Sequence, residues 1–348
     1  MKITAAILRA TGEPLSIEDD IEVPTLRPGQ VLVKLAYAGV CHSQLMEVRG
    51  LRGQDRYLPH MLGHEGSGIV VEVGAGVGKV VPGDRIILGW IRGDGADVPG
   101  SEYARHGHKI NAGAVTTFSD YAVVSENRCV SLPDGIPMDI ATLFGCAVMT
   151  GMGIVDHEVD PPPGSTIAII GLGGIGMSAL MACTLREPAA LIAMDVSQDK
   201  LDLAKQLGAS HAIDANSNPL TALRDITGGR GVDFAIEAAG RASTIEQAFA
   251  SIRRGGLCVF ASHPPAGDMI KIDPYELIAG KRIRGSWGGA CHPDRDVPRI
   301  ATAFRDGRLP LRAMIKQTYA LHEINRALED LEQRRVVRPL ITIDPLLC

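Results

Sequence analysis

The sequence lacks the features of an exported, disulfide-stabilised protein. It contains seven cysteines, at positions 41, 129, 146, 183, 258, 291 and 348, and none belongs to a C-x-x-C pair. Scattered cysteines, odd in number, in a chain of 348 residues argue against a disulfide framework and favour reduced thiols. The N-terminal residues MKITAAILRA lack the long apolar core of a signal peptide. We therefore predict a cytoplasmic protein.

The sequence also lacks the charge pattern of a nucleic-acid or membrane-surface protein. Its net charge is −5 and its pI is about 6.1, with no basic run. One uncharged segment, 167–185, is long enough to span a membrane. However, the glycines within 171–176 would break a helix in mid-membrane. A buried strand, a glycine turn and a helix explain this segment better, so we expect neither nucleic acid nor membrane as a partner.

The length and the hydrophobic pattern indicate two domains. With 45% hydrophobic and 22% charged residues, the composition is that of an ordinary globular protein, and 348 residues exceed one typical core. The first 135 residues or so are β-rich, with glycine and proline between the strands. Residues 138–155 have helical spacing. From 166 to 262 apolar strands alternate with helices, which predicts a parallel sheet covered on both faces.

A glycine-rich motif lies at the start of this alternating region. Gly171-Leu-Gly173-Gly174-Ile175-Gly176 follows an apolar strand and opens a helix. In that context the first glycine permits a tight turn, the second lets a pyrophosphate approach, and the third lets helix and strand pack closely. Asp195 ends the next strand, where an acid accepts hydrogen bonds from ribose hydroxyls and repels a 2′-phosphate. The motif predicts a dinucleotide site that prefers NAD to NADP.

Three further motifs together suggest a metal site, although each has an ordinary explanation alone. Cys146 alone would be a small buried hydrophobe, and His64 alone a hydrogen-bonded core histidine. With Cys41 they supply two thiolates and one imidazole. That is a set of three protein ligands typical of a catalytic zinc with an open fourth position.

On these motifs the chain resembles the medium-chain, zinc-containing alcohol dehydrogenases along nearly its whole length. The matching segments are Gly-Val-Cys-His-Ser at 39–43, Gly-His-Glu-Gly-Ser-Gly at 63–68, Val-Pro-Gly-Asp at 81–84, 145–151, 171–176 with Asp195, and Arg-Pro-Leu-Ile at 338–341. The resemblance implies a GroES-like β-rich catalytic domain, 1–147 and 288–348, and a Rossmann NAD-binding domain, 148–287. It also implies an active site in the cleft between them.

The resemblance further implies roles for individual residues. Cys41, His64 and Cys146 match the zinc ligands, and Glu65 matches a carboxylate that can approach the metal during ligand exchange. Ser43 matches the hydroxyl that takes up the alcohol proton. The cofactor contacts implied are His42 and Arg338 at the phosphates, Asp195 and Lys200 at the adenosine ribose, Arg241 beside the adenine, and Thr150 at the nicotinamide. Trp90 matches an aromatic wall of the alcohol pocket, and we expect His263 to face that pocket.

The sequence departs from the family pattern in three places. Many relatives carry four closely spaced cysteines for a structural zinc, but 93–108 contains none, so we predict one zinc per subunit. We interpret His106 and His108 in this segment as solvated surface. Gln44 replaces an aspartate that orients the ligating histidine; an amide oxygen can still orient His64 but leaves it less basic. Met46 replaces a proton-relay histidine.

The sequence therefore predicts a zinc-dependent alcohol dehydrogenase that transfers hydride between a primary or secondary alcohol and NAD. Two alternatives are a zinc-free NAD(P)H quinone or enone reductase of the same superfamily and a non-catalytic NAD-binding protein. The ligand set, together with Ser43 and Glu65, disfavours both. Residues 282–287 match the edge-strand region through which the family dimerises, so we expect a homodimer or homotetramer.

Overall fold

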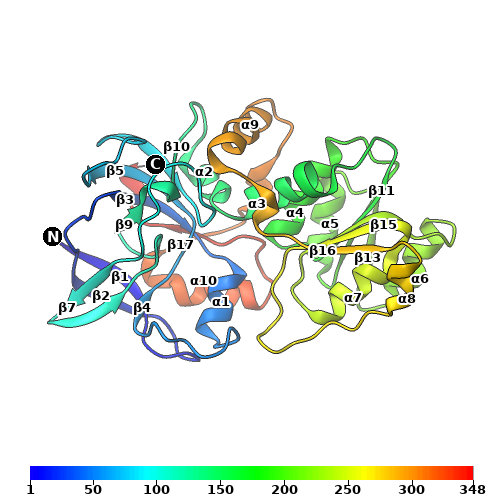
Figure 1. Ribbon diagram of the computed structural model, residues 1–348, viewed down its shortest axis with the longest axis horizontal. Helices are drawn as coiled ribbons and strands as arrows, with labels where there is room; N and C mark the ends of the chain where they lie inside the picture. The colour runs from blue at the N-terminus through cyan, green and yellow to red at the C-terminus, as the bar shows by residue number, and fades with distance from the viewer. Residues whose placement is uncertain (348) are drawn as a thin grey trace. The chain divides into compact units, whose positions relative to one another are not determined.

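The computed structural model describes residues 1–347, so Cys348 lies outside the described residues. The chain forms two compact units, each considered by itself below (Figure 1). The first comprises Met1–Cys146, His292–Arg305 and Ile315–Cys348, and the second comprises Ala147–Cys291 and Asp306–Met314. The predicted boundaries placed 147, 288–291 and 306–314 in the first domain, whereas these residues lie in the second unit.

The first unit is rich in antiparallel sheet. A closed barrel runs in the order β1 (Lys2–Leu8), β2 (Ser16–Glu22), β7 (Glu102–Arg105), β8 (His108–Asn111) and β4 (His60–Met61). A second sheet runs in the order β10 (Cys129–Ser131), β6 (Arg85–Leu88), β5 (Gly66–Val73), β3 (Gln30–Gly39), β18 (Leu340–Thr342) and β17 (Thr318–Ala320), with β9 (Tyr121–Ser125) also paired to β3. The helices of this unit are α1 (His42–Val48), α2 (Met138–Phe144), α9 (Pro293–Arg305), α10 (Ile324–Glu332), and the 3-10 turns Glu126–Arg128, Leu321–Glu323 and Pro345–Leu347.

Strand β3 organises the core of the first unit because it pairs with three other strands. Val31, Val33 and Leu35 alternate along it and pack into a cluster with residues of β5, β6 and β9. Gly68 on β5 lies opposite Leu35, and a Cβ at this glycine would clash with the carbonyl of Lys34. Close pairing of β3 with β5 therefore brings together the chain segments that follow β3 and precede β5.

The second unit contains a parallel sheet with its helices in sequence between the strands. The sheet order is β13 (His211–Asp214), β12 (Ala190–Asp195), β11 (Thr166–Ile170), β14 (Val232–Glu237), β15 (Ile252–Phe260) and β16 (Arg282–Gly285). The helices are α3 (Ala147–Gly153), a π-helix (Ile154–Val159), α4 (Gly174–Thr184), α5 (Gln198–Gln206), α6 (Pro219–Ile226), α7 (Ala242–Ser251), α8 (Pro274–Ile278), and the 3-10 turns Gly288–Ala290 and Leu311–Met314.

Both faces of this parallel sheet are covered. Ala168 and Ile170 pack in one cluster with Leu223 of α6 and Phe249 of α7. Ile169 points to the other face, where it lies against Gly176 of α4. Sheet strands buried on both faces read as continuous apolar runs, as in β11, Thr-Ile-Ala-Ile-Ile, and β12, Ala-Leu-Ile-Ala-Met-Asp. The predicted α/β class, a GroES-like β-rich domain plus a Rossmann sheet, is confirmed.

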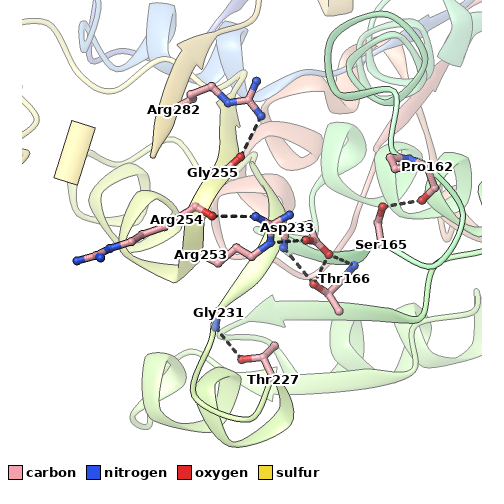
Figure 2. A network of polar contacts seen from close by, with 10 residues as sticks. All are labelled: Pro162, Ser165, Thr166, Thr227, Gly231, Asp233, Arg253, Arg254, Gly255 and Arg282. Atoms are coloured by element: carbon pink, nitrogen blue, oxygen red, sulfur yellow. Dashed lines mark hydrogen bonds and ion pairs between the residues drawn. The ribbon is translucent and has the colours of Figure 1, made fainter. Parts of the chain in front are cut away.

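The sheet also has a polar network where its strands begin, shown in Figure 2. The carboxylate of Asp233, on β14, accepts hydrogen bonds from the Thr166 backbone N–H at 2.7 Å and from the Thr166 hydroxyl at 2.7 Å. Its other oxygen accepts from Nε of Arg253 at 2.6 Å. This network ties together the starts of β11, β14 and β15. It lies at the amino-terminal end of the strands, whereas the glycine turn lies at their carboxyl end.

Local predictions match the structure closely in this sheet and less closely elsewhere. The uncharged segment 167–185 forms β11, the glycine turn and α4. The helical segment 138–155 is interrupted between α2 and α3, at Gly145 and Cys146. Among the described residues no single helix is long and apolar enough to cross a membrane, although the bent pair Met138–Phe144 with Ala147–Val159 meets the length and composition requirement.

Candidate active site

The first unit brings the three predicted metal ligands together. Cys41 lies between β3 and α1, His64 precedes β5, and Cys146 lies at the break between α2 and α3. Their ligand atoms, two thiol sulfurs and one imidazole nitrogen, all lie within 4.8 Å of one another. The pairing of β3 with β5 places the first two, and contacts of α2 with both strands place the third.

The three side chains are mostly buried, and one of their nitrogens has no hydrogen-bond partner, as expected for a metal site. Cys41 is 9% exposed and Cys146 is 4% exposed. Nε2 of His64 is buried and has no hydrogen-bond partner among the described residues. A buried ring nitrogen without a partner is costly, and here it lies beside two thiols. Two sulfurs and one nitrogen are a donor set that zinc prefers.

The two thiols differ in acidity because they interact with each other. A hydrogen bond from Cys146 lowers the pKa of Cys41, and Arg338 and His64 lower it further. The same hydrogen bond raises the pKa of Cys146, and burial adds to that rise. Metals bind thiols in the deprotonated form, so a metal at this site would favour loss of the thiol protons.

Gln44 holds the other nitrogen of the His64 ring, but not in the predicted way. The buried amide oxygen of Gln44 accepts the Cys41 backbone N–H at 2.9 Å. The amide nitrogen then faces Nδ1 of His64, which also lies 3.4 Å from the Ser43 hydroxyl. In the structure the amide nitrogen of Gln44, and not its oxygen, faces Nδ1, so the orientation of His64 by the amide oxygen stays a prediction.

Glu65 and Arg338 form a buried ion pair behind the ligands. Glu65 is fully buried and Arg338 is 3% exposed. Burial raises the pKa of Glu65, and Arg338 opposes that rise. Arg338 also interacts with the sulfur of Cys41. The room for the Glu65 side chain comes from Gly39 and Gly145, where a Cβ would collide with it. The pairing of Arg338 with Glu65 was not anticipated, and its phosphate contact stays a prediction.

The remaining predicted residues of the first unit are more accessible. His42 is exposed and Ser43 half-buried at the start of α1. Trp90 is half-buried, and its backbone N–H donates to the carbonyl of Gly145 at 3.4 Å. His106 and His108 are exposed at the turn between β7 and β8.

A cavity of about 790 Å³ in the first unit reaches His64 and Gln44. Other lining residues include Glu47, Asp55, Tyr57 and His60, and Trp90 is not among them. Glu47 pairs with Arg52 at 2.7 Å, and His60 with Asp55 at 2.8 Å. The cavity walls thus contain the Glu47–Arg52 ion pair and a hydrogen bond between His60 and Asp55, neither of which was predicted from the sequence.

In the second unit the glycine motif adopts the predicted strand, turn and helix. Gly171 has a φ of +89°, a conformation that favours glycine. A Cβ on Gly176 would collide with the Gly171 carbonyl, whereas a Cβ on Gly173 would meet nothing within 4 Å. The space before Gly173, at the start of α4, therefore suits a ligand that approaches the backbone. A helix start of this kind, without a side-chain cap, offers N–H groups to phosphate.

Asp195 lies beside this turn at the end of β12. Its carboxylate accepts the backbone N–H groups of Leu172 at 2.7 Å and Ser197 at 3.0 Å. Lys200 is buried on α5, and Arg241 is exposed immediately before α7. These contacts fix the carboxylate against the loop that would carry the dinucleotide.

Two predicted residues lie elsewhere in the second unit. Thr150 is 3% exposed, and its hydroxyl has no hydrogen-bond partner among the described residues. His263 is exposed, and its Nδ1 donates to the carbonyl of Pro264 at 2.6 Å. The sequence analysis missed Glu237, a fully buried carboxylate at the end of β14. Its signal was an acid at the carboxyl end of a parallel strand, three positions before Gly240.

Comparison with known families identifies both parts of the chain. Residues 27–134 match the alcohol dehydrogenase GroES-like domain, and 174–304 match the zinc-binding dehydrogenase domain. A protein of Mycobacterium tuberculosis named "Putative alcohol dehydrogenase D" is 30% identical over 98% of this chain and 100% of its own length. The fold and the site thus define the class of the protein, an oxidoreductase built from these two domains. The chain belongs to the medium-chain, zinc-type alcohol dehydrogenase family.

Solved structures agree. The crystal structure of an alcohol dehydrogenase zinc-binding domain protein from Burkholderia ambifaria is similar with a TM-score of 0.90 and 29% identity, covering 99% of both chains. That of benzyl alcohol dehydrogenase from Acinetobacter calcoaceticus is similar with a TM-score of 0.89 and 27% identity, covering 99% of this chain and 100% of that one.

Proposed function

We propose that this protein is a zinc-dependent alcohol dehydrogenase that transfers hydride between a primary or secondary alcohol and NAD, giving an aldehyde or ketone. The observation that carries the proposal is the partnerless Nε2 of His64, buried within 4.8 Å of the Cys41 and Cys146 thiols. Family membership supports the reaction class. The cysteines at 93–108 that would hold a structural zinc are missing, so we propose one zinc per subunit.

The chain's own residues would act as follows. Cys41, His64 and Cys146 would hold the zinc, which as a Lewis acid lowers the pKa of a bound hydroxyl. Ser43 would receive the proton of the alcohol, and Glu65 would approach the metal when ligands exchange. The ion pair with Arg338 compensates the charge of the Glu65 carboxylate in the buried site. Met46 offers no proton relay, so the proton would pass from Ser43 towards solvent.

The second unit would bind the dinucleotide, which supplies the hydride acceptor. The start of α4 would receive the pyrophosphate, Asp195 and Lys200 the ribose, and Arg241 the adenine. His42 and Arg338 are proposed phosphate contacts, Thr150 a nicotinamide contact, and Trp90 and His263 walls of the alcohol pocket. Asp195 is the reason to propose NAD in preference to NADP.

We propose a homodimer formed through β16. This strand is an edge of the parallel sheet, because only β15 pairs with it among the described strands. Exposed apolar side chains accompany it: Ile278 is 81% exposed and Trp287 is 82% exposed. Open edges with apolar neighbours are suited to pairing with another chain.

The six cysteines of the described residues are free, which supports a reducing, cytoplasmic location.

Metal analysis combined with an NADH absorbance assay tests the proposal. We expect zinc in the purified protein and NADH formation from a panel of alcohols that includes benzyl alcohol, since one relative is named for that substrate. NAD and NADP are assayed in parallel. Turnover of quinones or enones without zinc would instead support a zinc-free reductase. NAD binding without turnover of any alcohol or carbonyl compound would support a non-catalytic protein.

A further inference from the structure

The parallel sheet of the second unit contains a buried carboxylate that none of the roles above uses. Glu237 ends β14 and is fully buried. Carboxylates are rarely buried completely, because removing the charge from water is costly unless hydrogen bonds compensate. Burial raises the pKa of Glu237, and its hydrogen bonds oppose that rise. Retaining such a group needs a structural or functional reason.

The hydrogen bonds of Glu237 join two separate loops. Oε1 accepts the backbone N–H groups of Ala239 at 2.8 Å and Gly240 at 2.9 Å, and the Thr244 hydroxyl at 2.7 Å. Oε2 accepts the Ser262 hydroxyl at 2.6 Å. The first three donors belong to the loop after β14 and the start of α7, and Ser262 belongs to the loop after β15. One side chain thus fixes both loops.

These two loops lie at the point where the strand order of the sheet reverses. The chain passes outwards from β11 through β12 to β13, and then returns to β14 on the other side of β11. Ligands of such sheets bind outside the carboxyl ends of the strands at this point. Glu237 pairs in register with Ile170, the residue immediately before the glycine turn.

The loop held by Glu237 touches the glycine turn directly. A Cβ added to Gly171 would lie 2.5 Å from the backbone nitrogen of Ala239. That same nitrogen donates to Glu237. Gly240 has a φ of +83°, so the loop turns sharply at the second residue that the carboxylate holds. A shift of this loop would therefore move one wall of the dinucleotide crevice.

We propose that Glu237 is a positioning residue for the dinucleotide: by holding the loops 238–241 and 261–263 against the glycine turn, it keeps the crevice formed before the cofactor arrives. The inference rests on the proposed use of NAD. Preorganisation lowers the ordering cost of binding. Loss of the carboxylate should therefore weaken cofactor binding without slowing hydride transfer once the cofactor is bound.

The test compares Glu237→Ala with Glu237→Gln in the full-length protein, using NADH titration and steady-state kinetics. The alanine variant should raise the Kd for NADH about 10-fold or more, with kcat at saturating NAD and zinc content within about twofold of the parent. The glutamine variant keeps an oxygen for the three donors at Oε1 and should change the Kd less than about threefold. Rescue by glutamine would show that hydrogen bonding, and not charge, positions the loops.

Asp233→Ala is the matched control. Asp233 lies on the same strand and also joins neighbouring strands by several hydrogen bonds, but at the opposite end of the sheet (Figure 2). It should lower the melting temperature and leave the Kd for NADH unchanged. An equal rise of the Kd in Asp233→Ala and Glu237→Ala would reduce Glu237 to a general stabilising residue and overturn the inference.

Ser262→Ala keeps the inference testable if Glu237→Ala does not fold. It removes the one hydrogen bond from the second loop to the Glu237 side chain, while the Ala261 backbone N–H still donates to the Glu237 carbonyl at 3.0 Å, and should raise the Kd about threefold. An unchanged Kd in the folded variants would overturn the positioning role. Failure of the parent protein to bind NADH would instead reject the proposed function and the inference with it.

Discussion

The glycine turn of the second unit is built from six consecutive residues, 171–176, whereas the metal ligands of the first unit come from positions 41, 64 and 146. The turn is one continuous segment between its own strand and helix, and β12 adds hydrogen bonds to its Gly171 and Leu172 N–H groups. The ligand group needs β3 paired with β5, and α2 packed against both. One site is therefore encoded locally, and the other is assembled by the folding of a whole unit.

The two sites should therefore respond differently to the loss of a single residue. A metal group with three protein ligands has no spare ligand, so losing one should abolish it. The dinucleotide site spreads its contacts over a turn, a carboxylate and a helix start, so single changes should weaken it by degrees.

The largest effect is expected from Cys146→Ala. Loss of this ligand should remove the zinc and lower alcohol oxidation at least ~1000-fold, since the metal contributes several kcal/mol to the reaction. Elemental analysis and NADH absorbance measure both quantities. The Kd for NADH should stay within about twofold if the two sites are independent.

Cys129→Ala is the control for Cys146→Ala. Cys129 is also fully buried in the first unit, and burial raises the pKa of its thiol to about 12. It lies in β10 and is not part of the ligand group. The variant should retain zinc and activity. Full turnover by a zinc-free Cys146→Ala protein would refute the metal mechanism.

The next largest effect is expected from Asp195→Asn. The amide keeps an oxygen for the N–H groups of Leu172 or Ser197 but removes the charge that would repel a 2′-phosphate. The ratio of kcat/KM for NAD to that for NADP should fall about 100-fold, because juxtaposed like charges cost several kcal/mol.

The matched control is Asp214→Asn. Asp214 is the register partner of Asp195 on the neighbouring strand β13, and it is exposed. Its neutralisation should leave the coenzyme ratio unchanged. If both variants shifted the ratio equally, a diffuse charge effect would replace the specific role of Asp195.

A smaller effect is expected from Gly173→Ala. The added methyl group would meet no protein atom within 4 Å, so folding should be unaffected. It would instead occupy the space of the pyrophosphate, and the Kd for NADH should rise about 10-fold. Gly78→Ala, where a Cβ also meets nothing within 4 Å, is the control and should bind NADH normally. Unaltered NADH binding by Gly173→Ala would place the dinucleotide elsewhere.

The same contrast explains which features the sequence could predict. The alternation of apolar strands and helices from 166 to 262 was expected, and β11 to β15 form there, because apolar runs between turns report local structure. The ligands Cys41, His64 and Cys146 were recognised by resemblance, since their spacing alone has no periodicity. Long-range packing then brings their ligand atoms together.

The partners of buried polar groups could not be predicted in this way. Arg338 and Glu65 are 273 positions apart, and their ion pair depends on β18 lying beside β3. Likewise, nothing local shows that Ser262 donates to Glu237, 25 positions earlier. Such pairs are decided by which strands become neighbours. The orientation of the Gln44 amide depends in turn on the backbone N–H of Cys41.

Gln44→Asp should have an effect no larger than that of Gly173→Ala, and would sharpen the account of the assembled site. In the structure the amide nitrogen of Gln44 faces Nδ1 of His64. Because the amide N–H can only donate, Nδ1 is the acceptor in this contact. A metal on Nε2 instead leaves the ring proton at Nδ1, where an acceptor is needed. A carboxylate can accept that proton, so zinc affinity should rise about 10-fold in chelator competition. Gln44→Asn, with a shorter side chain but no charge, should give no gain. Weaker zinc binding by the aspartate variant would show that the hydrogen bond to the Cys41 N–H matters more than the charge beside His64.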